Sequence, residues 1–145
     1  MGHRSVAVEI AAEPRVVYAL YTDGARLGEW SGARKVESSG PLDRVGSRFS
    51  ASYGGPFTVR GEVVAVEPAV SHTMRLSELG GLVTCLTSAR FEPAGAGTRL
   101  SLSFDYRAKG GPLAGLLDAV AGGEMVGTFT KDAARLKVIA EREAR

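Results

Sequence analysis

The side chains best suited to chemistry are one histidine and two tyrosines, which lie in segments that alternate as β-strands do. His72 shares a strand face with Met74 and Leu76, and an imidazole can act as a general acid or base near neutral pH. Tyr53 and Tyr106 fall on apolar strand faces, where a hydroxyl could orient a ligand carbonyl or phenol. Each also has a structural interpretation, as a hydrogen-bonded histidine at a strand end or a tyrosine reaching water. His72 is therefore the one catalytic candidate, with both interpretations open.

Two further positions belong to this candidate site. Cys85 and Thr87 face the interior if Phe91 does, but the parity of segment 82–92 is ambiguous. Because no histidine or basic residue is near Cys85 in the sequence, nothing there would lower the pKa of its thiol, and we expect a buried, inert cysteine. Trp30 lies at the end of a short helix expected over 25–30 and either borders a cavity or anchors the short helices.

Composition excludes several classes of protein. Two histidines and one cysteine are too few for a zinc site, and no P-loop, G-x-G-x-x-G, HExxH or serine-elbow motif is present, so we expect no metal and no cofactor. The 18 basic and 16 acidic residues are dispersed, which argues against a nucleic-acid partner. The first residues lack the apolar core of a signal peptide, and no apolar run approaches the ~20 residues of a membrane span.

These features predict a single cytoplasmic domain over residues 1–145, without stable membrane insertion. The single cysteine fits a reducing compartment. The chain is expected to be a monomer or a homodimer, since nothing in its sequence decides between them.

The order of the expected elements specifies an architecture. Alternation over residues 5–11 predicts a strand, Glu13-Pro14 opens a helix that ends near residue 22, and a second short helix covers 25–30. Further strands are expected over 33–39, 45–53, 57–67, 70–79, 82–92 and 98–107, with Val45 and Val70 on the inward faces. Because Val64 and Val66 break the alternation of their strand, we expect a bulge near Gly61.

A change of period marks the end of the chain. Apolar residues recur at three and four over 112–143, which predicts one long amphipathic helix. Gly122-Gly123 either bends this helix or breaks it in two, and Glu124 lies on its apolar face. The fold class is therefore α+β: a curved antiparallel sheet of about seven strands around a long C-terminal helix, with two short helices between strands 1 and 2. A curled sheet and a straight helix leave room for a cavity.

Several segments, taken in order, resemble the START/polyketide cyclase-like (SRPBCC) superfamily and its helix-grip fold. They are VAVEIAAEPRVVYALYTD, Trp30, RVGSRFS, RGEVVAVEP, RFEPAGAGTRLSLSFDY and LKVIAERE, which together extend over nearly the whole chain. The resemblance implies a hydrophobic pocket between sheet and helix. It carries over no catalytic residue, because this superfamily shares none.

We therefore expect a protein that binds a small hydrophobic molecule, polyketide-like or lipid-like. The expected ligand-binding residues are those placed inward by parity, with the short-helix tryptophan: Trp30, Phe49, Tyr53, Phe57, His72, Met74, Cys85, Thr87, Phe104, Tyr106, Leu116 and Val120. One alternative is a polyketide cyclase or aromatase, in which His72 is the base and a tyrosine stabilises an enolate. Another is a co-chaperone-type interaction module, which would need a large exposed apolar patch.

Overall fold

The computed structural model describes residues 2–54, 57–78, 81, 83–108 and 114–145, and for residues 2, 54, 57, 78, 108 and 114–126 it describes the backbone alone. The described strands form one antiparallel seven-stranded sheet in the order β1-β7-β6-β5-β4-β3-β2. Their bounds are β1 Gly2–Ile10, β2 Lys35–Ser38, β3 Arg48–Gly54, β4 Phe57–Glu67, β5 Ser71–Glu78, β6 Val83–Ala94 and β7 Gly97–Ala108. The α+β prediction and the order of its elements are confirmed.

Two short helices and a 3-10 turn connect β1 to β2. Helix α1 spans Pro14–Tyr21 and begins with its proline, a position where the missing N–H costs nothing. In the turn η1, Gly24–Arg26, the Asp23 carboxylate accepts the Ala25 N–H at 3.1 Å. Helix α2, Leu27–Ser31, ends at Gly32, whose φ of 75° lies in the left-handed region that glycine tolerates. The sequence prediction joined η1 and α2 into one helix.

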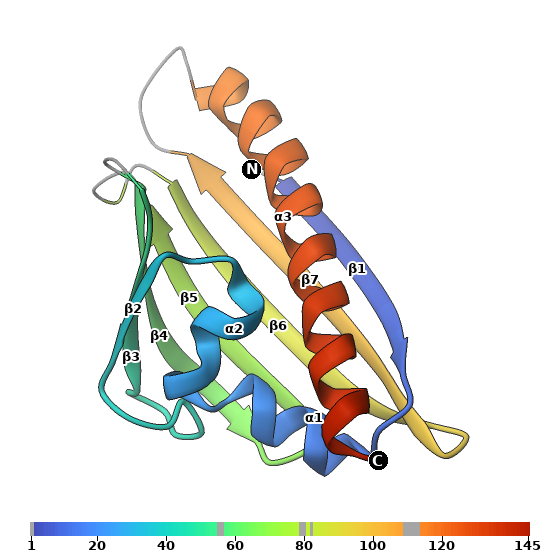
Figure 1. Ribbon diagram of the computed structural model, residues 1–145. Coiled ribbons are helices and arrows are strands. Elements are labelled where there is room, and N and C mark those ends of the chain that lie inside the picture. Colours follow the sequence, from blue (N-terminus) through green and yellow to red (C-terminus); the bar gives the residue numbers. More distant parts are fainter. Residues whose placement is uncertain (1, 55–56, 79–80, 82, 109–113) are drawn as a thin grey trace.

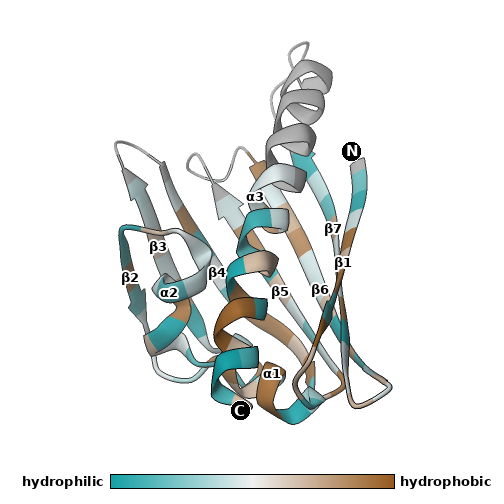
Figure 2. Ribbon diagram, turned by 45° about the vertical axis from the view of Figure 1, so that its right-hand side comes forward, coloured by the Kyte–Doolittle hydropathy of each residue, from teal (hydrophilic) through white to brown (hydrophobic). Residues whose placement is uncertain are grey.

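The long helix α3, Ala114–Glu143, lies across the concave side of the sheet (Figure 1). It is continuous through Gly122-Gly123, so the two-helix alternative is wrong. In Figure 2, brown apolar segments lie on α1 and on the lower half of α3, where these helices meet. That half of α3 carries buried Ala133, Leu136 and Ala140.

Polar contacts hold the C-terminal end of α3 in place. Lys137 Nζ donates to the Glu9 carbonyl at 2.7 Å, and Glu141 accepts the Ala11 N–H at 2.8 Å, so two turns of the helix bind the end of β1. Arg26, beside α2, forms an ion pair with Glu143. The first two contacts satisfy backbone groups at the end of β1, the Glu9 carbonyl and the Ala11 N–H.

Cross-strand register decides which side chains face α3. Thr87 pairs with Met74 and with Phe104, and Cys85 pairs with Tyr106. Alternate residues of β6 are buried, from Val83 through Phe91, which settles the parity of this strand. Cys85 and Thr87 therefore face inward, as the parity argument with Phe91 required.

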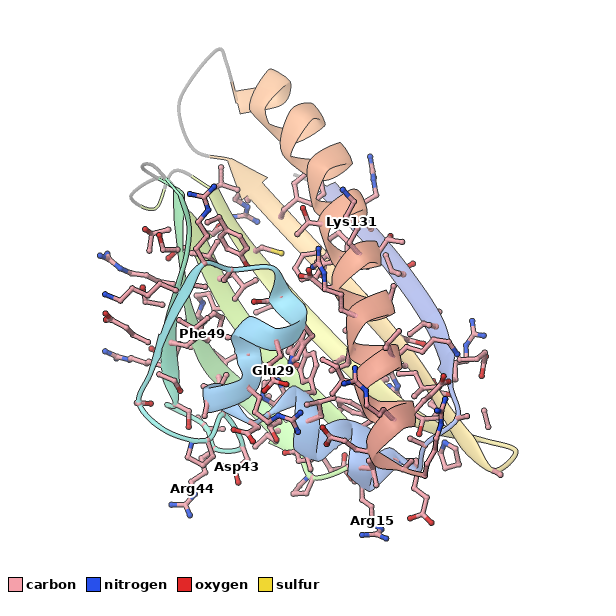
Figure 3. All side chains as sticks on the ribbon, in the orientation of Figure 1. Arg15, Glu29, Asp43, Arg44, Phe49 and Lys131 are labelled. Carbon is pink, nitrogen blue, oxygen red and sulfur yellow. The ribbon has the colours of Figure 1, made fainter. Side chains whose placement is uncertain are left out.

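The predicted bulge is misplaced. The register between β4 and β5 shifts between Val63 and Ala65, rather than at Gly61. Gly61 serves a different purpose: it lies opposite Phe49, and a Cβ there would come within 2.1 Å of the ring (Figure 3 labels Phe49). The alternation was lost at Val64 because the extra residue is inserted there.

Two inward assignments made from the alternation are also wrong. Val45 is 64% exposed and Val70 is 42% exposed, and both precede the strands to which they were assigned. The strand alternation was extended into turns, where it no longer fixes which way a side chain faces.

We predict that Gly61→Ala destabilises the fold by about 1–3 kcal/mol, because the new methyl overlaps the Phe49 ring. Gly127→Ala is the matched control: it lies in α3 with no atom within 4 Å of the new Cβ. We expect it to stabilise by up to ~1 kcal/mol through helix propensity. Urea unfolding measures both changes, and equal effects of the two substitutions would contradict the Phe49 explanation.

Candidate functional site

A cluster of aromatic rings joins α1 and α2 to the sheet. The Tyr21 ring stacks on Trp30 at 5.3 Å between centroids, and its edges meet His72 at 5.3 Å and Phe91 at 5.6 Å. Tyr18 makes edge contacts with His72 and Phe91 as well. All five residues are buried or nearly so, and they come from four elements, α1, α2, β5 and β6. The cluster therefore fixes the short helices over the inner face of the sheet.

His72 is fully inside this cluster, with 1% of its surface exposed. Its Nε2 is 2.6 Å from the Leu42 carbonyl, and because a carbonyl only accepts, Nε2 must carry the proton. Burial lowers the pKa of His72, which favours the neutral ring. Nδ1 is then an unprotonated acceptor, the form that a general base requires.

Asp132 is the buried carboxyl of the site, and it comes from α3. It is 5% exposed and lies 3.1 Å from Arg135 Nη1, which also donates to the Trp30 carbonyl at 3.4 Å. Burial raises the pKa of Asp132 to about 7, although Arg135 acts in the opposite direction. By contrast, Arg15 and Arg44 point into solvent (Figure 3), with side chains that are 78% and 88% exposed.

The Tyr21 hydroxyl interacts electrostatically with Asp132 of α3 and with Cys85 of β6. Burial raises the pKa of Tyr21, and the nearby Asp132 carboxyl and Cys85 thiol add to the effect. Cys85 Sγ and Thr87 Oγ1 are 3.4 Å apart on the inner face of β6. A phenol, a carboxyl, a thiol and a hydroxyl thus gather between β6 and α3.

Three polar atoms near this aromatic cluster are buried without a hydrogen-bond partner: Tyr18 Oη, Trp30 Nε1 and His72 Nδ1. Leaving such a group unsatisfied costs about 1–3 kcal/mol. Because folded proteins satisfy nearly all of their buried polar groups, each of the three requires an explanation.

The structure brings most of the predicted site residues to the inner face. Buried and inward are Trp30, Phe49, His72, Met74, Cys85, Thr87, Phe104 and Tyr106. Phe104 stacks on Phe129 of α3 at 4.8 Å. Tyr53 is half-buried. Phe57, Leu116 and Val120 lie outside the described side chains.

Tyr106, one of the two predicted tyrosines, does not meet the predicted histidine. Tyr106 pairs with Cys85, whereas His72 pairs with Ala89, four residues farther along β6. At about 3.3 Å per residue, this separates them by roughly 13 Å. Instead, Tyr106 lies under the Arg4 guanidinium, 5.9 Å from the ring centroid. The tyrosines beside His72 are Tyr18 and Tyr21, which the sequence analysis assigned to a helix and did not consider.

Asp132 was also missed, although the sequence contains a signal for it. It falls on the apolar face of α3, three residues after Phe129 and four before Leu136, where a charge is unusual. The same argument was made for Glu124, whose side chain lies outside the described residues. Among the residues that the structure does describe, no three His, Cys, Asp or Glu side chains gather as a metal site. No helix in that part of the chain has the length and apolar run needed to cross a membrane.

A family model described as polyketide cyclase / dehydrase and lipid transport matches residues 1–141. No curated protein matches the chain. Among solved structures, protein CV1439 from Chromobacterium violaceum is 16% identical with a TM-score of 0.77, and 96% of each chain is covered. A Rhodobacter sphaeroides protein is 24% identical with a TM-score of 0.70, over 94% of this chain and 90% of that one.

A third similar structure is DynU16, a protein of the dynemicin biosynthetic locus. It is 22% identical to this chain with a TM-score of 0.68, and 98% of this chain is covered. This chain spans only 48% of DynU16, about half its length. At these identities the three structures show a shared fold.

We predict that Asp132 makes the protein less stable as the pH rises. Its folded pKa of about 7 exceeds the reference value of 3.8, so between these values the folded state holds a proton that the unfolded state has lost. The stability from this group is therefore full below pH 4 and is lost as the pH rises through 7. Asp132→Asn removes the effect. The free energy of unfolding of this variant, taken relative to that of the parent, should therefore increase by about 2–4 kcal/mol from pH 4.5 to pH 8.

Urea unfolding at both pH values measures this difference. His72 titrates in both proteins, so its contribution cancels in the comparison. A stability difference that stays constant with pH would show that the Asp132 carboxyl has an ordinary pKa in the folded protein.

Proposed function

Because the chain belongs to the polyketide cyclase/dehydrase and lipid transport family, we propose that it binds a small hydrophobic molecule between the inner face of the sheet and α3. The family match supports the class of ligand, and the fold positions the surface that would contact it. The proposed ligand is polyketide-like or lipid-like.

One observation carries this proposal: apolar side chains and a few uncharged polar groups lie on the inner face of the middle strands β5, β6 and β7. Met74, Phe104 and Leu76 supply apolar surface, while Thr87 and Cys85 supply weak polar contacts. Small-molecule sites are mostly apolar, with a few placed polar groups that orient the ligand. The inner face has this composition.

The proposal places the protein in the cytoplasm, as a monomer or homodimer that works without a metal or other cofactor. A co-chaperone-type module is not favoured. The exposed large apolar residues of the described chain are Val45, Val70, Leu86 and Val138, which come from two turns, the outer face of β6 and α3. Such scattered residues need no partner to cover them.

We predict that Thr87→Leu weakens binding of an apolar fluorescent probe at least about tenfold, because the larger side chain extends from β6 into the proposed site. Ser88→Leu is the matched control: it makes a similar enlargement on the next residue of β6, which faces the opposite side of the sheet. Probe titration, with circular dichroism to confirm folding, measures both. Equal affinities of the two variants would place the ligand elsewhere.

We propose cyclase or aromatase chemistry as a second candidate function, and the unpartnered Nδ1 of His72 supports it. In such a step, the C–H bond next to a ketone breaks, its proton moves to Nδ1, and the electron pair becomes an enolate. Tyr18, whose hydroxyl is also unpartnered and whose ring lies 6.4 Å from that of His72, is the suitable donor to the enolate oxygen.

We predict that the protein accelerates exchange of the α-protons of 1-tetralone in D₂O, and that His72→Gln abolishes the acceleration. Glutamine can still donate to the Leu42 carbonyl but offers no base, which limits the damage to the fold. Proton NMR follows the exchange. If His72→Gln exchanges 1-tetralone as fast as the parent does, His72 is a structural residue and the enzyme proposal loses its base.

A further inference from the structure

We propose that the indole N–H of Trp30 is the donor that recognises a neutral oxygen of the ligand, such as a ketone or ester carbonyl, and that Asp132 disfavours ligands with a carboxylate there. This inference rests on the proposed binding function and adds the polar chemistry that the ligand must carry.

The first step is the state of the Trp30 side chain. The residue is 5% exposed, and its Nε1 is buried without a hydrogen-bond partner. An indole nitrogen only donates, so whatever satisfies it must present an acceptor. The described protein atoms supply none within hydrogen-bond distance, which makes a bound molecule the candidate acceptor.

The second step is that the indole ring is held in place. Its face stacks on Tyr21, with an angle of 20° between the ring planes. Its backbone carbonyl accepts from Arg135, and Gly32, two residues on, lets Arg135 approach: a Cβ at Gly32 would lie 2.9 Å from Nη1. The ring therefore has little freedom to turn toward another acceptor, and a donor fixed in advance binds its partner at a lower entropic cost.

The third step is the ion pair that is attached to the backbone of Trp30. Arg135 links Asp132 to the Trp30 backbone, but the two members of this ion pair differ in burial. The Arg135 side chain is 45% exposed and that of Asp132 is 7% exposed. The buried end of the pair is therefore the carboxyl, which repels a carboxylate ligand and tolerates a neutral oxygen.

Buried water is the rival explanation for the unpartnered N–H. Water would satisfy Trp30 whether or not the ligand has an oxygen, so it predicts no preference between a ketone and the corresponding hydrocarbon. The comparison of matched ligands separates the two explanations.

The experiment uses three bicyclic probes of the same skeleton: 1-tetralone, tetralin and 1,2,3,4-tetrahydro-1-naphthoate. Trp30 is the only tryptophan of the chain, so indole-¹⁵N labelling gives one side-chain resonance that reports this site. Affinities are measured at pH 8 for the full chain and for Trp30→Phe, which keeps an aromatic ring on Tyr21 but removes the N–H.

We expect 1-tetralone to bind the parent about tenfold more tightly than tetralin, and the carboxylate to bind more weakly than the ketone. The indole proton should move downfield with 1-tetralone but not with tetralin, and the preference for the ketone should vanish in Trp30→Phe. The spectral shift is measured on the parent alone, so it does not depend on the folding of the variant.

Equal affinities for tetralin and 1-tetralone, or an indole proton that 1-tetralone leaves unmoved, would overturn this inference and leave the proposed function standing. Tighter binding of the carboxylate than of the ketone would overturn the role of Asp132. If none of the three probes binds the parent, both this inference and the proposed function for this class of ligand fail.

Discussion

The apolar concave face of the sheet has to be covered by α3, and this contact decides where the other elements lie. Seven strands curve around one helix, whose C-terminal half is bound to the end of β1 through Lys137 and Glu141. Arg135 extends the same attachment to α2 by binding the Trp30 carbonyl. Helices α1 and α2 then close the lower end of the layer with Tyr21 and Trp30. Both short helices packed against α3 therefore contribute residues to the candidate site, Tyr21 from α1 and Trp30 from α2.

Burial limits the charge inside that site. It acts in opposite directions on the two strongest acid–base groups, because it disfavours whichever form carries charge: the pKa of Asp132 rises and that of His72 falls. Tyr21 stays protonated for the same reason. An interior with hydrogen-bonding groups but little charge suits a neutral molecule with few polar atoms.

Strand alternation and turn residues predicted the sheet well, because one buried face imposes a period of two over whole strands such as β7. The bulge was expected near Gly61 but lies at Val64, because an inserted residue disturbs the alternation without showing where it is inserted. The site was harder to predict. Tyr18 and Tyr21 resemble ordinary core residues of an amphipathic helix, and only tertiary structure brings them to His72. Asp132 was detectable as a charge on an apolar helix face, but its partner Arg135 was not. Trp30 was predicted as a site residue, but nothing in the sequence linked it to Arg135 and Asp132.

The pairing of β1 with β7 also constrains how the chain can fold. Val6 lies opposite Leu102, so two strands nearly a hundred residues apart in sequence must pair before β1 can form the edge of the sheet. Contacts of such long range make folding slow. During synthesis, β1 leaves the ribosome before β7 and has no partner strand until β7 follows. Until then the nascent chain carries an unpaired, partly apolar strand, the kind of segment that aggregates or recruits chaperones.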